Sequence, residues 1–253
     1  MTLRAEPVER WLPEGKQAAV CFSIDDVHPG RSKDHYDGGG DLGAGALGLV
    51  EWLLGRHPAL RVTLFVTADW REISPSPSRL LSAVPFLRER MYLTRVLPKG
   101  SRSVARSPEF VAYVRSLPRT EVGFHGLHHV HRGPLVHVEF QDESVAECEA
   151  ALREMERLFE AAGWGYVRGL CPPGWNAPQA LLDALERRGF DFVASARDIR
   201  TPVTLGALTQ MSGLRGVPLV QPAWLGDGRR LLHFATNFQA TSAVERAVQV
   251  IEQ

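Results

Sequence analysis

With 253 residues, 44% of them hydrophobic, the chain is long enough to bury one large core, and an α/β barrel of this size is ordinary. Its 29 lysines and arginines balance 29 aspartates and glutamates, so no overall charge would draw it to nucleic acid or an anionic membrane. No apolar run approaches the roughly 20 residues of a membrane span, and the N-terminus lacks the apolar core of a signal peptide.

Two adjacent carboxylates, Asp25 and Asp26, follow an apolar run that begins at Ala18 and is typical of a buried strand. Like charges side by side repel each other, and a bound cation would offset that repulsion. One acid could then be a ligand and the other a base. The plain alternative is that the pair caps the strand and opens a turn toward Pro29.

The next segments predict a β-α-β unit, which implies parallel strands. A loop rich in glycine and charge runs from Pro29 to Gly45, and it lacks both the GK[ST] and GxGxxG patterns of phosphate-binding loops. Apolar residues at helical spacing then predict a helix that ends at Gly55. Residues 61–68 are apolar and β-branched and predict a second buried strand.

Residues 71–118 are long for a connection between two strands and carry repeated Ser-Pro and Pro-Lys-Gly loop signals. Insertions of this length after a strand often form a lid or a substrate wall. We expect this insertion to cover the carboxyl ends of the strands. A plain surface excursion is the alternative.

A cluster of histidines begins at the end of a third short strand, residues 121–124. His125 and His129 are four residues apart, but the surrounding glycines argue against a regular helix, so one tight turn must bring the two imidazoles together. Neutral imidazole is a good zinc ligand, and a facing carboxylate would complete a three-ligand site with room for water. His128 and His131 form a competing pair, and a solvated loop is the plain alternative.

Helices and strands continue to alternate in the second half of the chain. Ser144-x-x-Glu147 suits a capping box at the start of an amphipathic helix over 142–163, with Cys148 in its core stripe. The three cysteines of the chain form no CxxC and cannot all pair, so we expect a reduced, cytoplasmic protein. Further segments complete the pattern: strands at 166–171, 190–195, 217–220 and 230–235, a helix from Pro178 to Gly189, and a last helix from Ser242 that carries no stop signal.

These elements predict a single α/β domain over residues 1–253, a distorted (β/α) barrel of about seven parallel strands. The candidate polar residues lie at the carboxyl ends of the expected strands, where barrels of this kind have their active sites. The rigid turn Pro172-Pro173-Gly174-Trp175 lies at one of these ends. It could present an aromatic face to a sugar ring, or it could be a plain turn with a half-buried tryptophan.

Five segments together carry a resemblance to one known family. They are SIDDV at 23–27, TLFV at 63–66, HGLHH at 125–129, CPPGW at 171–175 and LLH at 231–233. In this order and spacing they are similar to the TFDDG, TFFV, H[ST]xxH, RxPxY or RPPGW, and LxH motifs of the polysaccharide deacetylases, the NodB-homology carbohydrate esterases of family 4.

The resemblance implies a metal-dependent hydrolase that removes an N-acetyl group from a sugar or glycoconjugate. It implies that Asp26, His125 and His129 hold a divalent metal ion, with zinc favoured by ligand type. Asp25 would take the proton of the attacking water, and His233 would protonate the departing amine.

The same resemblance implies a small-molecule or glycan substrate. The turn at Pro173 and Gly174 would stabilise the oxyanion through backbone N–H groups, and Trp175 would line the face of the sugar.

Three departures from the family pattern leave an alternative open. Cys171 stands where the family has an arginine that orients the catalytic aspartate, with Arg168 three residues earlier, and Asp198 is the one candidate for the acid of the fourth motif. Phe234 follows His233 where the family has an aspartate, so the family's last histidine could also lie beyond Gln253. The alternative is a non-catalytic barrel that binds carbohydrate or metal. A cysteine hydrolase built on Cys171 is a third reading, with nothing in the sequence to activate the thiol.

Overall fold

The computed structural model describes residues 5–32, 38–73, 95–130, 139–194, 222–225 and 231–235. The strands of the main sheet are β1 Ala5–Pro7, β2 Ser23–Val27, β3 Val62–Val66, β6 Thr120–Phe124, β7 Gly169–Leu170, β8 Phe192–Ala194, β9 Ala223–Leu225 and β10 Leu231–Phe234. A separate pair is formed by β4 Glu72–Ile73 and β5 Arg95–Val96. The helices are α1 Ala46–Arg56, α4 Pro108–Ser116, α5 Val145–Ala161 and α6 Gln179–Arg187, and the 3-10 turns are η1 Leu42–Ala44, η2 Val104–Arg106 and η3 Pro173–Trp175.

The eight strands form one sheet in the order β1-β9-β10-β8-β7-β6-β3-β2. From β10 to β2, the strands β10, β8, β7, β6, β3 and β2 form a run in which each pair is parallel. Strand β9 is antiparallel to both β10 and β1, so β1 runs in the same direction as the parallel strands. The expected mostly parallel α/β architecture is therefore confirmed, with β9 as the reversed strand.

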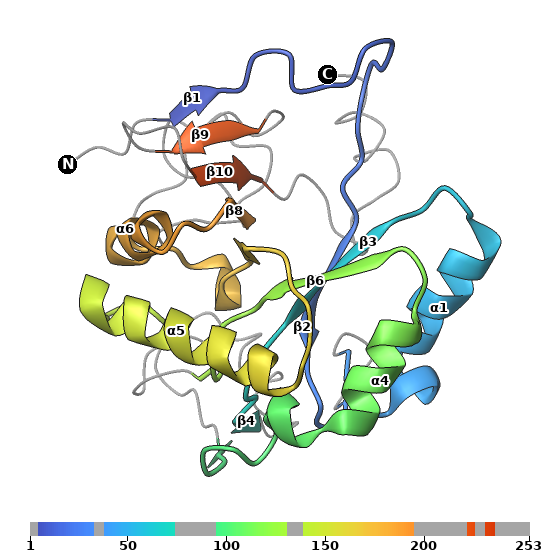
Figure 1. Cartoon of the computed structure of the whole chain (residues 1–253), viewed down its shortest axis with the longest axis vertical. Helices are drawn as coiled ribbons and strands as arrows, with labels where there is room; N and C mark the ends of the chain where they lie inside the picture. Colours follow the sequence, from blue (N-terminus) through green and yellow to red (C-terminus); the bar gives the residue numbers. More distant parts are fainter. Residues whose placement is uncertain are drawn as a thin grey trace, which may run out of the picture.

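The expected closed barrel is not what the described residues form. Strands β1 and β2 stand at the two ends of the sheet and do not pair with each other. In Figure 1 they lie at separate places, with β1 beside β9 at one end of the molecule and β2 among the central strands. The sheet is open in this part of the chain, and the candidate strand at 217–220 lies outside the described residues.

The hydrophobic core lies between the helices and the face of the sheet that they cover. Leu64, Phe124, Leu170 and Val193 are fully buried there, because side chains alternate along a strand and every second one faces the helices. Helices α5 and α6 cover one half of the sheet and α1 and α4 the other (Figure 1). Helix α4 is the crossover between β3 and β6, so it belongs to the regular β-α-β pattern.

Helix α5 matches its sequence signals. The Ser144 hydroxyl accepts a hydrogen bond from the Glu147 N–H, and the Glu147 carboxylate accepts one from the Ser144 N–H at 2.8 Å, which forms the expected capping box. Cys148 is fully buried on its inward face, as expected for a core residue. Helix α1 differs slightly, since it runs through Gly55 and ends at Arg56.

The expected strand from Ala18 is wrong for its first half. Strand pairing with β3 begins only at Ser23, and Val20 and Phe22 are 57% and 36% exposed. Because β2 is an end strand of the sheet, its N-terminal approach has a neighbour on one side at most, and an apolar run there need not be buried.

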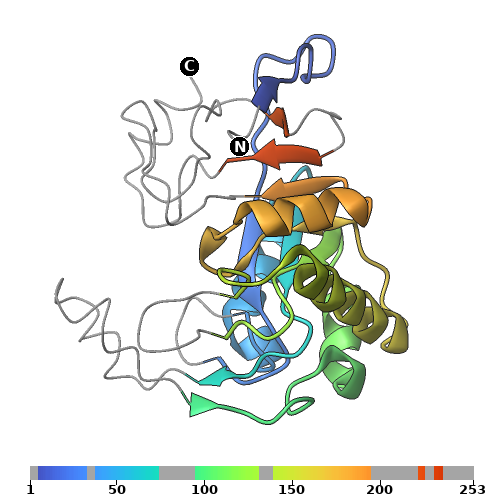
Figure 2. The same cartoon turned by 90° about the vertical axis from the view of Figure 1, so that its left-hand side faces the viewer.

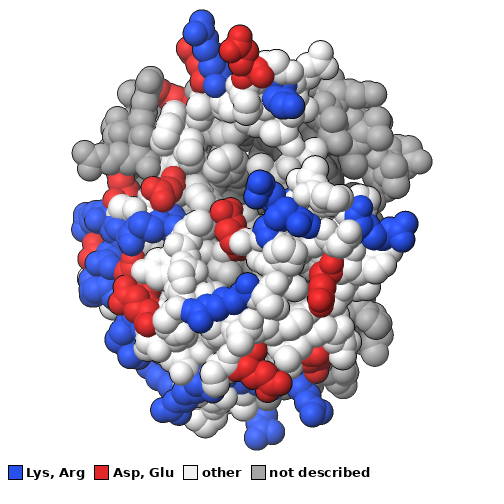
Figure 3. Space-filling model, turned by 45° about the vertical axis from the view of Figure 1, so that its right-hand side comes forward, with Lys and Arg blue, Asp and Glu red and all other residues white. Residues whose placement is uncertain are grey.

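The surface mixes both signs of charge on the face shown in Figure 3. Ion pairs along α5, such as Arg157 with Glu154 at 2.7 Å, join charges of opposite sign on the surface. None of the described helices is long and apolar enough to cross a membrane.

Candidate functional site

Polar side chains from β2, β6 and β7 meet at the carboxyl edge of the sheet. Strand β2 does not end at its two aspartates, as the sequence suggested. Instead its register against β3 shifts between Ile24 and Val27, and Asp26 has a left-handed backbone with φ 57°. A bulge of this kind re-aims side chains that strict alternation would send to opposite faces. Both carboxylates therefore reach the same edge.

Asp26, His125 and His129 come together as three ligand-type groups. Asp26 Oδ1 lies 3.1 Å from His125 Nε2 and 3.0 Å from His129 Nε2. Ligand atoms around a tetrahedral zinc ion are about 3.3 Å apart when the bonds are about 2.0 Å long. One carboxylate and two imidazoles at this spacing fit a divalent ion with a position left for water.

His125 is held in the form that binds metal. Its Nδ1 lies 2.7 Å from the Cys171 carbonyl oxygen, to which it donates, and its backbone N–H donates to the Val66 carbonyl at 2.9 Å. The side chain is almost fully buried. Because Nδ1 is taken by this hydrogen bond, Nε2, the nitrogen beside Asp26, is the ring nitrogen left to bind a metal.

The His129 ring is fixed by stacking. It lies against Trp70 with ring centroids 4.4 Å apart, and His28 covers the Trp70 ring at 4.1 Å. The Trp70 indole N–H donates to the Glu72 carbonyl at 2.7 Å, which fixes the tryptophan in turn. No sequence motif pointed to Trp70.

The charges around His129 shift its pKa. Burial alone would lower it, but the hydrogen bond to Asp26 and the charges of Asp26, Glu72 and Glu139 raise the pKa of His129 to about 9. Burial tends to raise the pKa of Asp26, yet its hydrogen bonds to His125 and His129 hold that pKa well below the usual range. Without a metal, the site is thus a carboxylate paired with an imidazolium.

His128 does not join this cluster. Its Nδ1 lies 3.1 Å from the Asp69 carbonyl oxygen and 3.4 Å from Asp69 Oδ2. Burial tends to raise the pKa of Asp69, but hydrogen bonds from His128 and from the Gly100 N–H lower it below its ordinary value. His131, the other member of the competing pair, lies outside the described residues.

Within the described residues, only one of the two carboxylate oxygens of Asp25 accepts hydrogen bonds. Its Oδ2 accepts the indole N–H of Trp175 at 3.0 Å and the thiol of Cys171 at 3.4 Å. Its Oδ1 is buried and has no hydrogen-bond partner within the described residues. A carboxylate with one oxygen fixed and the other unengaged suits a proton acceptor.

The Trp175 indole donates its N–H to Asp25 from the turn η3, where Gly174 and Trp175 both have left-handed backbones. Its expected role in lining a sugar face stays a prediction. Arg168 does not take the place of the missing family arginine, since its guanidinium pairs with Glu156 at 2.9 Å.

His233 lies in a different row of the sheet from His125. It pairs in register with Val193, which pairs with Leu170, which pairs with Phe124. Side chains directly opposite each other share a face, and this row faces the helices, whereas His125 is the residue after Phe124. The register gives no support for His233 as the proton donor, and that role stays a prediction. Asp198 lies outside the described residues.

A second group of ligand atoms overlaps the first. Asp25, His125 and Cys171 also offer one ligand atom each within 4.8 Å of one another. His125 belongs to both groups, and its Nδ1 is already committed to the Cys171 carbonyl. The set formed by Asp26, His125 and His129 is the better metal site, because its three atoms converge without breaking that bond.

The insertion begins beside the histidine loop, residues 125–129. The N–H groups of Ala68, Asp69 and Arg71 donate to carbonyl oxygens of that loop at 2.8 to 3.2 Å. Figure 2 shows β4 and β5 leaving the sheet at this edge. Residues 74–94 of the insertion lie outside the described residues, so the role of the insertion as a cover stays a prediction.

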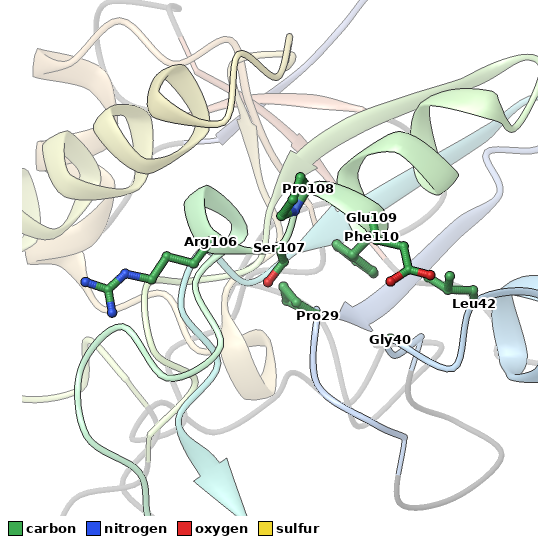
Figure 4. A pocket seen from close by; sticks show the side chains of 8 residues that line it. All are labelled: Pro29, Gly40, Leu42, Arg106, Ser107, Pro108, Glu109 and Phe110. Carbon is green, nitrogen blue, oxygen red and sulfur yellow. The ribbon is translucent and has the colours of Figure 1, made fainter.

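A separate pocket of about 300 Å³ lies near the start of α4. Its lining is Pro29, Gly40, Leu42, Arg106, Ser107, Pro108, Glu109 and Phe110. The guanidinium of Arg106 points away from the other lining residues (Figure 4). None of the candidate ligands or the base lines it, so it is distinct from the site above.

No protein-family model matches the sequence, and no curated protein matches it. Among solved structures the chain is similar to a family 4 carbohydrate esterase from Streptomyces lividans, in complex with acetate, with 15% identity and a TM-score of 0.39 over 70% of this chain. It is also similar to the Streptococcus pyogenes deacetylase PplD, in complex with acetate, with 11% identity and a TM-score of 0.46 over 94% of this chain.

The match spans 62% of the Streptomyces lividans chain, less than two thirds of its length, and 73% of the Streptococcus pyogenes chain. Both proteins are deacetylases or carbohydrate esterases, the kind of protein that the sequence motifs resemble. Such low identities and TM-scores carry no activity over to this chain.

Proposed function

We propose that this protein is a metal-dependent hydrolase that removes an N-acetyl group from a sugar or glycoconjugate. The observation that carries the proposal is that His125 Nε2 and His129 Nε2 lie 3.1 and 3.0 Å from Asp26 Oδ1, next to a second carboxylate, Asp25, whose Oδ1 is buried without a hydrogen-bond partner among the described residues. A plain structural cluster would not need an unpartnered carboxylate oxygen, because burying one without a hydrogen bond is costly.

The donor set fits a divalent ion, with zinc the first choice. Asp26, His125 and His129 would hold it, and the Cys171 carbonyl keeps His125 in the correct tautomer. When bound, such an ion supplies Lewis-acid chemistry and lowers the pKa of a water molecule.

Asp25 would act as the general base. Trp175 and Cys171 hold its Oδ2, so its Oδ1 is the atom that would accept a proton from the attacking water. Both donors to Asp25 among the described residues are neutral, whereas the arginine of the family motif would supply a cation.

The substrate class rests on the motif resemblance. The acetyl group would have to enter between Asp25 and the three ligands, and the turn η3 stands directly beside Asp25, where Pro173, Gly174 and Trp175 would contact a sugar. A glycan or a smaller acetylated sugar is therefore the substrate to test first.

The test combines metal analysis with an acetate-release screen. The purified protein, loaded with Zn²⁺, Co²⁺ or Mn²⁺, would be offered N-acetylglucosamine, chito-oligosaccharides and acetylated glycoconjugates, and free acetate would be measured. We expect about one ion per chain and release that a chelator abolishes. Metal binding without release from any substrate would favour a non-catalytic protein that binds carbohydrate or metal, and absence of metal binding would reject the metal site itself.

A further inference from the structure

Glu139 contacts the histidine loop, yet none of the sequence motifs includes it. Its carboxylate accepts hydrogen bonds from two successive backbone N–H groups, those of His128 and His129, each at 3.0 Å. Hydrogen bonds to an ionised acceptor are stronger than neutral ones. Two of them on neighbouring amides fix the peptide unit that leads into His129.

The backbone of His129 needs such a restraint. Its φ is 50°, in the left-handed region that is uncommon for a residue other than glycine. Conformations of this kind persist only where the surrounding structure holds them. This backbone conformation places His129 Nε2 3.0 Å from Asp26 Oδ1.

Gly126 makes room for the Glu139 carboxylate. The residue has φ +84°, and a Cβ added to it would overlap Glu139 Oε2 and the Pro173 ring. In the motif that this loop resembles, the same position holds serine or threonine. Here the carboxylate of Glu139, ten residues after His129 in the chain, fills the space of that small side chain.

We propose that Glu139 is a positioning residue for the metal ligand His129, and that it replaces the hydroxyl residue absent at Gly126. The inference rests on the proposed metal site. The Glu139 carboxylate holds the histidine loop in the shape that binds metal, and it contributes a negative charge close to the ligands. Outer partners of metal ligands typically change metal affinity when they are removed.

The experiment measures Zn²⁺ affinity by competition with a chromophoric chelator for the wild type, Glu139→Ala and Glu139→Gln. We expect Glu139→Ala to bind about 10–100-fold more weakly. Glu139→Gln should fall in between, since it keeps one oxygen acceptor and loses the charge.

Glu147→Ala is the matched control. Glu147 also accepts a backbone N–H, that of Ser144 at 2.8 Å, but it caps α5 and contacts none of the ligands. We expect this variant to lower the melting temperature of the metal-free protein while its Zn²⁺ affinity stays within about threefold of the wild type, because the cap acts on the helix alone.

The outcomes separate the inference from the function on which it rests. A wild type that binds no Zn²⁺ overturns the metal site itself. A wild type that binds Zn²⁺, with Glu139 variants of unchanged affinity or with Glu147→Ala equally weakened, overturns the role of Glu139 and leaves the site standing. If Glu139→Ala does not fold, Glu139→Gln gives the decision.

Discussion

At the scale of single residues, the site depends on two adjacent aspartates with different partners, since Asp26 contacts two histidines and Asp25 contacts Trp175 and Cys171. The spacing of His125 and His129 and the pair Asp25-Asp26 were visible in the sequence, and the structure brings all four to one edge of the sheet. The hydrogen bond from Trp175 to Asp25 was not predictable, because the two residues are far apart in the chain. The signal in the sequence was Cys171, which stands where the resembled motif has an arginine. Its presence there indicated that another donor had to hold Asp25.

The first prediction separates the two aspartates. Asp26 contacts both histidines, whereas Asp25 contacts Trp175 and Cys171. We expect Asp25→Asn to keep its metal and to lose acetate release by about 10²–10⁴-fold, the usual scale for a general base. Asp26→Asn should lose much of its metal. Metal content and single-substrate turnover would be measured on both variants, and equal metal loss would indicate a shared structural role.

The second prediction concerns the hydrogen bond from Trp175 that orients Asp25. Trp175→Phe keeps an aromatic ring and removes the indole N–H that donates to Asp25 at 3.0 Å. We expect turnover to fall by about 10–100-fold with metal content unchanged, because the base loses its orientation. Trp52→Phe, on the exposed face of α1, is the control and should leave turnover as it is. A rise in KM with kcat preserved would instead assign Trp175 to substrate binding alone.

The third prediction follows from the raised pKa of His129, about 9 in the metal-free protein. Because the folded-state pKa lies above the ordinary value, this group stabilises the fold below about pH 6.5 and the contribution is lost as the pH rises through about 9. A metal ligand must be neutral, so Zn²⁺ binding at pH 7 should release about one proton.

Titration calorimetry in buffers of different ionisation enthalpy measures that proton. The release from His129 should fall to about half a proton near pH 9 and become small by about pH 10, since His129 then loses its proton before the ion binds. Zn²⁺ binding at pH 7 without proton release would contradict either the raised pKa of His129 or its role as a ligand, and the metal content of His129→Ala would decide between the two.

At the scale of elements, prediction succeeded where local signals decide the outcome. The Ser144–Glu147 capping box and the apolar stripe of α5 are local, and the helix begins where they indicate. It failed at residues 18–22, because burial of an apolar run depends on which strand stands beside it. The bulge in β2 also escaped prediction, since it depends on the register against β3 and not on the aspartates themselves.

Two elements matter most for the site. The turn η3 places Trp175 over Asp25, and the histidine loop is hydrogen-bonded to residues 68–71 at the start of the insertion. The sequence marked both segments by their proline, glycine and histidine content. The contacts between them depend on strand order, which a single sequence does not reveal.

At the scale of the whole molecule, the order of strands brings the site together. Strands β2, β3, β6 and β7 are neighbours in the sheet, so their carboxyl ends meet although the residues come from distant parts of the chain. The parallel α/β class was predictable from alternating strands and helices. Closure was not, since the pairing of the end strands is a property of the assembled sheet.

The last prediction uses this long-range assembly. The three ligands come from β2 and from the loop after β6, and they are close together only when the sheet is formed. A metal ion that binds the folded chain alone must therefore stabilise it. At a free Zn²⁺ concentration 100 times the Kd, the gain in unfolding free energy should be about 2.7 kcal/mol. For a chain of this length that is a rise in Tm of roughly 5 °C or more.

The rise would be measured by thermal unfolding with and without Zn²⁺, and EDTA should reverse it. Asp26→Asn should lose the rise, because the carboxylate shared by both histidines is gone, whereas Asp25→Asn should keep it. Equal stabilisation of the wild type and Asp26→Asn would place the ion elsewhere on the molecule.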